Sequence, residues 1–254
     1  MKVTWAGESG QFVRPPTEVG NLPSMTTEVS RQPTRMAEFS GDGGVAVQAE
    51  PDVVEAQGIE ERLARSLVQG GFLALKAATS QAPAVHRSLE RFGFSPNDMV
   101  TVDLEQWFLE ELKVLASDKR VSWDTVLKAD ALTEGQERIY LRQLTDDAAL
   151  RLEARLQEAG QRVIAWNPGV LVAYDHLDVI NRLRMLSGTA NAKLQTLWLV
   201  VFGDTGRTRP MVDGQAIPVD GPVEWVDLSD PWLRNLHRQD LLVSNAATSG
   251  GATQ

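Results

Sequence analysis

The spacing of apolar residues over positions 56–243 changes along the chain, and each spacing predicts one kind of element. Apolar residues three or four positions apart indicate helices, whereas short uninterrupted apolar runs indicate buried strands. These patterns predict a helix ending at Gly70, strands at 72–77, 99–102, 163–166 and 197–202, and helices at 82–92, 104–115, 123–128 and 170–186, with one or two more between 141 and Gly160. Strands that alternate with helices predict an α/β fold whose sheet of four to five strands is mostly parallel, with helices flanking it.

Two further features complete the predicted domain. The helical segments at 123–160 form an insert between the second and third strands. Near the C-terminus, two short apolar runs flank Asp213-Gly214, a dipeptide that strongly favours a two-residue β-hairpin turn. The chain from Trp225 to Arg238 is predicted to be a short closing helix. The domain therefore extends over residues 56–243.

The two ends of the chain lack both kinds of spacing. Residues 1–55 contain five prolines and isolated aromatic residues, and residues 244–254 are small, polar and uncharged. Segments of this composition bury too little apolar surface to offset the entropy of ordering. We expect a disordered arm at 1–55 and a disordered tail at 244–254.

Composition excludes several classes of chemistry. The chain has no cysteine, so disulfides, thiolate zinc sites and cysteine nucleophiles are ruled out. Its 25 lysines and arginines against 34 carboxylates give a formal charge of −9, which leaves nucleic acid possible as a partner but not favoured. The sequence has no apolar run of 18 residues, so we expect no membrane span and a cytoplasmic protein.

Common catalytic motifs are missing from the sequence. The chain has no Gly-Lys pair, so it has no standard phosphate-binding loop. No dinucleotide-binding glycine motif follows a predicted strand, and no G-x-S-x-G motif presents a serine. The three histidines are far apart and do not form a metal-binding pair. We therefore expect no resident cofactor and do not favour an enzyme.

Polar residues follow three of the predicted strands. Asp103, Asn167 and Asp204 lie at their carboxyl ends, where parallel sheets bind ligands, and Glu105 lies two residues after the first of them. The first two segments are similar to the magnesium-coordinating strand and the polar sensor strand of P-loop ATPases, so the fold is degenerate P-loop-like under this interpretation. The alternative is that Asp103 and Asn167 only cap helices or form turns, as strand-to-helix junctions require.

Three residues near the C-terminus are candidates for a protein interface. Trp225, Trp232 and Arg234 belong to residue types that are enriched where proteins meet.

One family resemblance suggests a biological setting. The matching stretches are GGFLALKA at 70–77, VSWDTVLKADA at 121–131, VIAWNPGVLVAYDHLDVINRLR at 163–184, LWLVVFGD at 197–204, PMVDGQAIPV at 210–219 and DPWLRNLHR at 230–238. Their order resembles the C-terminal α/β region of the PglW family, the serine/threonine kinases of type 2 BREX phage-defence systems. The kinase part is absent here, so the resemblance implies no kinase activity.

What the resemblance implies is a non-catalytic accessory or assembly module that binds larger defence proteins. An alternative from another class is a degenerate nucleotide-binding subunit of a multi-chain ATPase, whose phosphate loop comes from a partner. In that case a Mg-nucleotide would bind near Asp103, Glu105, Asn167 and Asp204. Both interpretations remain open from the sequence.

Overall fold

The computed structural model describes residues 51–91, 99–203 and 209–235. All of them belong to the second of two units into which the chain divides, 49–254. Residues 1–50 of the predicted arm at 1–55, and the whole predicted tail at 244–254, lie outside the described residues. No helix in the described ranges is long and apolar enough to cross a membrane.

A five-stranded sheet organises the described chain, in the order β2-β3-β4-β1-β7. Every pair of neighbouring strands is parallel. The predicted α/β class and mostly parallel sheet are therefore confirmed, and each predicted strand lies within two residues of an observed one. The strands are β1 (Gly71–Ala77), β2 (Val100–Asp103), β3 (Arg162–Trp166), β4 (Thr196–Phe202) and β7 (Trp225–Asp227).

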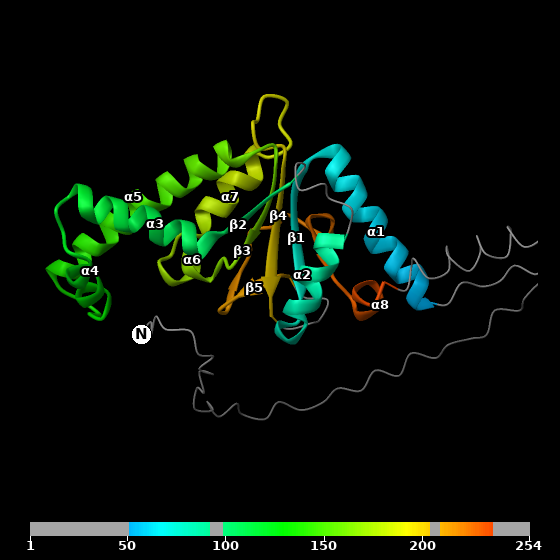
Figure 1. The fold of residues 1–254 in the computed structure, drawn as a ribbon, viewed down its shortest axis with the longest axis horizontal. Helices are drawn as coiled ribbons and strands as arrows, with labels where there is room; N and C mark the ends of the chain where they lie inside the picture. The colour runs from blue at the N-terminus through cyan, green and yellow to red at the C-terminus, as the bar shows by residue number, and fades with distance from the viewer. Residues whose placement is uncertain (1–50, 92–98, 204–208, 236–254) are drawn as a thin grey trace, which may run out of the picture. The chain divides into compact units, whose positions relative to one another are not determined.

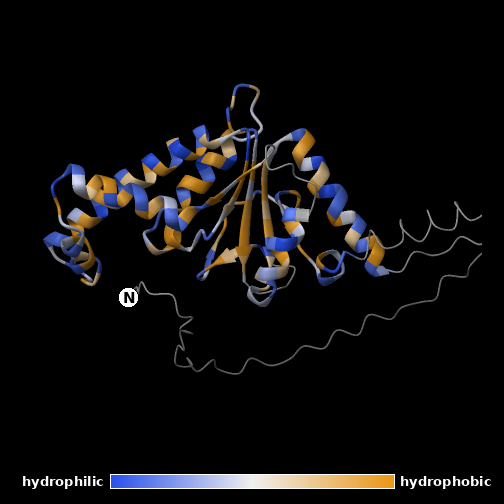
Figure 2. Ribbon diagram, viewed as in Figure 1, coloured by the Kyte–Doolittle hydropathy of each residue, from blue (hydrophilic) through white to orange (hydrophobic). Residues whose placement is uncertain are grey.

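Helices cover both faces of the sheet (Figure 1). One face carries α3 (Leu104–Asp118), α5 (Gln136–Ala159), α6 (Gly169–Ala173) and α7 (Leu177–Leu186), and the other carries α1 (Pro51–Gln69), α2 (Ala82–Arg91) and α8 (Asp230–Leu233). Successive side chains of a strand point to opposite faces, so β4 sends Leu197 and Leu199 into one apolar cluster and Trp198 and Val200 into the other. The strands are correspondingly among the most hydrophobic segments in Figure 2.

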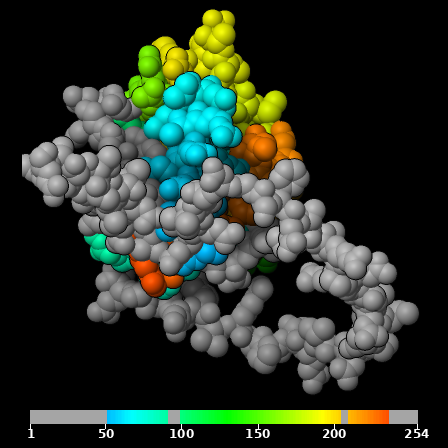
Figure 3. Space-filling view, turned by 90° about the vertical axis from the view of Figure 1, so that its right-hand side faces the viewer, coloured from blue at the N-terminus to red at the C-terminus, as the bar shows by residue number. Residues whose placement is uncertain are grey.

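The second face is closed by segments from the two ends of the described chain. Helix α1 packs against α8, and α2 contacts α8 as well. Figure 3 views the molecule from the side of α1, with the orange and red C-terminal segments beside the blue and cyan helix. The indole Nε1 of Trp232 donates to Glu60 Oε2 across this contact, at 3.0 Å.

The predicted helical insert is present and projects away from the sheet at the left of Figure 1. It consists of α4 (Trp123–Asp130) and the N-terminal half of α5, which pack against each other and against the end of α3. Ser122 caps α4, as predicted, because its side chain accepts a hydrogen bond from the Thr125 N–H. We call residues 119–145 the helical arm.

The predicted hairpin is also present, between β5 (Met211–Val212) and β6 (Gln215–Ala216). Asp213 and Gly214 both have positive φ, +48° and +81°, as a type I′ turn requires. The short 3₁₀ helices η1 (Thr79–Gln81) and η2 (Pro222–Glu224) complete the described elements.

Helix α1 begins earlier than the sequence predicted. It starts at Pro51, so residues 51–55 are helical and do not belong to a disordered arm. Proline fits the first turn of a helix because its missing N–H would have no intrahelical partner there. Val53 and Ala56 are buried, so the apolar stripe of α1 begins upstream of Ile59.

The helix predicted at 170–186 is wrong as one element, because it breaks into α6 and α7. Asp175 adopts a φ of +64°, the His176 N–H bonds to the Leu171 carbonyl, and the Asp175 N–H bonds to the Val172 carbonyl. This pair of hydrogen bonds is the Schellman motif that ends many helices. Glycine usually occupies the left-handed position at a helix end, so the aspartate at 175 did not indicate that a helix ends there.

The closing helix predicted at 225–238 is also wrong. Residues 225–227 form strand β7, which pairs with β1 so that Val226 lies beside Leu75, and the helix that follows is only four residues long. A short apolar run such as Trp225-Val226 cannot be assigned to strand or helix by periodicity alone. This segment is a strand because its backbone pairs with the edge of β1.

Candidate functional site

The carboxyl ends of all five strands meet at one edge of the sheet because the strands are parallel. Asp103 ends β2 and Asn167 follows β3, and the Asn167 amide donates to Asp103 Oδ2 at 2.8 Å. The structure therefore brings these two predicted site residues into contact. Asp204, the third predicted residue, lies outside the described ranges.

Asp103 is the N-cap of α3. Its backbone is extended, and its Oδ1 accepts a hydrogen bond from the Gln106 N–H at 3.0 Å. Both carboxylate oxygens are thus engaged within the chain, one by the helix and one by Asn167. This geometry is the capping alternative that the sequence left open.

Glu105 lies in the first turn of α3 and is half-buried. Burial, and after it the nearby charge of Asp103, raises the pKa of Glu105 above its ordinary value. The two acids therefore repel each other. In the ranges that the structure describes, no group of three or more histidines and acids is placed to hold a metal ion.

Aromatic rings cover the end of β3 on the other face of the sheet. His86 of α2 stacks on Trp166, with ring centroids 3.8 Å apart and planes 5° from parallel. Phe202, at the end of β4, lies 6.2 Å from the same indole. Trp166 is buried beneath these rings. This side of the carboxyl edge is therefore packed.

Lys76 is a charged residue of this edge that is not among the predicted site residues. Its side chain is only 2% exposed, its Nζ lies 2.9 Å from Asp227 Oδ1, and it lies 4.9 Å from the centroid of the Trp225 ring. Lys76 and Asp227 are register partners on adjacent strands. A lysine inside the apolar run FLALKA was the available signal, because a buried lysine requires a partner of opposite charge.

The three residues predicted as interface candidates, Trp225, Trp232 and Arg234, differ in exposure. Trp232 is 2% exposed and its indole donates to Glu60, so it packs in the core of this chain. Trp225 is half-buried against the core and beside Lys76. Arg234 is exposed and lies 3.6 Å from Asp230, one helical turn away.

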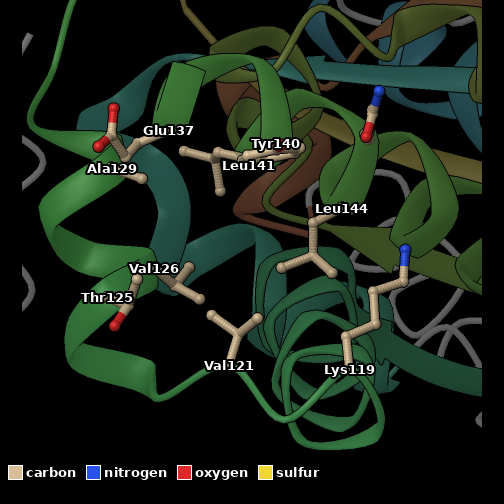
Figure 4. A pocket seen from close by; sticks show the side chains of 10 residues that line it. Lys119, Val121, Thr125, Val126, Ala129, Glu137, Tyr140, Leu141 and Leu144 are labelled. Carbon is tan, nitrogen blue, oxygen red and sulfur yellow. The ribbon is translucent and has the colours of Figure 1, made fainter. Parts of the chain in front are cut away.

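The helical arm contains an apolar groove that the sequence analysis did not predict (Figure 4). Helix α4 contributes Thr125, Val126 and Ala129, and α5 contributes Tyr140, Leu141 and Leu144. Val121, from the connection between α3 and α4, lies at the bottom of the view. The groove has a volume of about 220 Å³.

Comparison with known proteins gives a relative but no fold precedent. No protein-family model matches the chain, and no solved structure matches it. The chain is 28% identical to "Probable kinase PglW" of Streptomyces coelicolor over an alignment of 264 residues. This alignment covers 99% of the chain and 16% of the relative, so the chain spans about a sixth of the relative's length. The match confirms the resemblance seen in the sequence and is consistent with a C-terminal region of PglW.

Proposed function

We propose that this chain is an accessory or assembly module of a bacterial anti-phage defence system, and that it acts by binding larger defence proteins. The observation that carries the proposal is the similarity to PglW, which extends over 99% of the chain. The PglW family belongs to type 2 BREX phage-defence systems, and the resemblance implies this setting for the chain. Since only 16% of the relative is matched, its kinase function is not transferred to this chain.

The internal contacts at the carboxyl edge of the sheet support a role without catalysis. Asp103 uses both oxygens for internal hydrogen bonds, and Lys76 is paired with Asp227. A substrate would have to displace these contacts before either group could act on it. Side chains that are already satisfied hold the strand ends in place.

The experiment that tests the proposal is genetic and biochemical. The gene is deleted in its native host and restored with a tagged copy, and phage plating is measured together with mass spectrometry of the purified complex. We expect deletion to raise plating efficiency and the tagged chain to recover subunits of the defence system. Unchanged plating, with no such subunit recovered, would overturn the proposal.

A second candidate is the degenerate nucleotide-binding subunit. The parallel order β2-β3-β4-β1-β7 and the contact of Asp103 with Asn167 favour it, because both are similar to features of P-loop ATPases. Strands β1 and β2 are three strand spacings apart, or about 14 Å. A phosphate loop that meets Asp103 would therefore come from a partner chain and not from the end of β1.

Nucleotide binding separates the two candidates. ATP and Mg²⁺ are titrated against the chain, alone and with its co-purified partners, while thermal unfolding is followed. A ligand at 100 times its Kd stabilises by about 2.7 kcal/mol, which corresponds to about 5–10 °C for a domain of this size. The accessory role predicts no shift in either sample. A shift seen only with partners would favour the nucleotide-binding subunit.

A further inference from the structure

We infer that the groove of the helical arm docks a basic, amphipathic segment of a partner protein, which inserts one large apolar side chain between α4 and α5. This inference rests on the proposed function, because it identifies the surface and the chemistry through which the module would bind. The argument uses the size of the groove, the exposure of its rim and its charge.

The groove has the size of one anchor side chain. Its volume is about 220 Å³, whereas a cavity of about 150 Å³ is enough to hold a benzene ring. Val126 and Ala129 on one side and Leu141 and Leu144 on the other are buried, so its walls are firmly packed. An aromatic or a large aliphatic side chain fits such a site.

Large apolar side chains at the rim remain exposed in the chain. Tyr140 is 60% exposed and Val121 is 36% exposed, although both line the groove. Covering them would remove apolar surface from water, which favours association. Tyrosine is also among the residue types that contribute most to binding energy at protein interfaces.

The charge of the groove indicates which kind of segment it accepts. Glu137 and Lys119 lie at opposite ends of the group of residues in Figure 4. Lys119 is already paired with Asp147 at 2.6 Å, whereas Glu137 has no ion pair among the residues that the structure describes. The available charge at the groove is therefore negative, and a lysine or arginine near the anchor would complement it.

The chemistry of the groove argues against nucleic acid as the occupant. Its lining is mostly apolar and includes the acidic Glu137, so phosphates have no counterpart in it. A basic segment of another protein is the occupant that both the apolar walls and Glu137 favour.

Peptide selection against the full chain tests the inference. A display library of random 16-residue peptides is panned on the immobilised wild-type chain, and the enriched peptides are synthesised with a fluorescent label. Affinities are then measured by anisotropy for the wild type and for Tyr140→Ser, Glu137→Gln and Leu150→Ser. Leu150 is the matched control, because it is 60% exposed on the same helix but lies outside the groove.

We expect the enriched peptides to combine an aromatic or leucine anchor with nearby lysine or arginine. Tyr140→Ser should weaken their binding about tenfold or more, and Glu137→Gln should weaken it several-fold and reduce its dependence on salt. Leu150→Ser should leave it unchanged. All three positions are exposed, so the variants are expected to fold, and circular dichroism checks this.

Several results would overturn the inference. These are a failure of any peptide to enrich, equal binding by Tyr140→Ser and wild type, enrichment of acidic peptides, and a wild-type dimer that Tyr140→Ser dissociates. Purification from the host separates this failure from failure of the proposed function. If Tyr140→Ser still recovers defence subunits, the groove is not the docking site but the accessory role stands. If the wild type recovers none, the accessory role fails.

Discussion

Replacing Asp103 tests whether the carboxyl edge of the sheet serves structure or chemistry. Asp103 caps α3 through Oδ1 and accepts from Asn167 through Oδ2. Asp103→Ala removes both contacts. Asp103→Ser keeps a side-chain oxygen that can accept from the Gln106 N–H, but it removes the negative charge and the second acceptor. The two variants therefore separate the cap from the carboxylate.

The structure sets the expected magnitudes. Loss of an N-cap costs about 1 kcal/mol, and loss of the exposed hydrogen bond to Asn167 adds about 0.5 kcal/mol. Asp103→Ala should therefore lower the free energy of unfolding by about 1.5 kcal/mol, or about 3–6 °C in Tm for a domain of this size. Asp103→Ser should regain about 1 kcal/mol of this loss. Both variants relieve the repulsion of Glu105, so that contribution cancels in the comparison.

Urea unfolding and phage plating are the two measurements. Ser66→Ala is the control, because it removes the hydroxyl of α1 that accepts a hydrogen bond from the Trp198 indole, away from both Asp103 and the groove of the helical arm. If Asp103 is structural, Asp103→Ser should restrict phage as well as Ser66→Ala does. The reasoning is refuted if Asp103→Ser is nearly as stable as the wild type and yet abolishes restriction. It is refuted as well if serine is no more stabilising than alanine.

Three further predictions concern stability and are checked by urea unfolding. Asp227→Asn should cost about 3 kcal/mol because it removes the carboxylate 2.9 Å from the buried Lys76 ammonium, whereas adding Lys76→Met should recover most of the loss; a double variant as unstable as the single one would contradict this. Gly188→Ala should destabilise, since φ is +77° and a Cβ would lie 3.0 Å from the Gly71 backbone, whereas Gly58→Ala in the open middle of α1 should stabilise by about 1 kcal/mol. The pKa of Glu105 is raised by folding, so the contribution of this carboxyl to stability should fall as pH rises above about 4.3, and Glu105→Gln should stabilise relative to the wild type at pH 7 but not at pH 4.

Much of the fold could be predicted because the buried strands have strong local signals. The run LWLVVF of β4 is apolar at every position because helices cover both faces of the sheet. Asp213-Gly214 supplies two residues that tolerate positive φ, so the hairpin is also encoded locally. By contrast, the break at Asp175 uses a residue without a strong preference, and β7 exists only because β1 offers it an edge.

The candidate site was predicted in position, whereas its role was left open between ligand binding and helix capping. The carboxyl ends of parallel strands meet at one edge, and this rule alone placed Asp103 near Asn167. Whether their polar atoms face a ligand or each other depends on hydrogen-bond geometry, which residue spacing does not specify. The burial of Trp232 could not be predicted from the sequence either, because its partner Glu60 is 172 residues away in the chain.

The groove of the helical arm follows from a mismatch of helix lengths that residue spacing conceals. Helix α5 has 24 residues and is about 36 Å long, whereas α3 has 15 residues and is about 22 Å long. The first turns of α5 therefore extend past α3, and only the eight residues of α4, about 12 Å, are available to pack there. The apolar stripe from Leu141 to Leu156 is regular along its whole length. It therefore predicts a helix, but it does not show which turns of that helix α3 and α4 cover. Exposure of Tyr140 is the consequence, and this is why the variant at that position tests the docking surface.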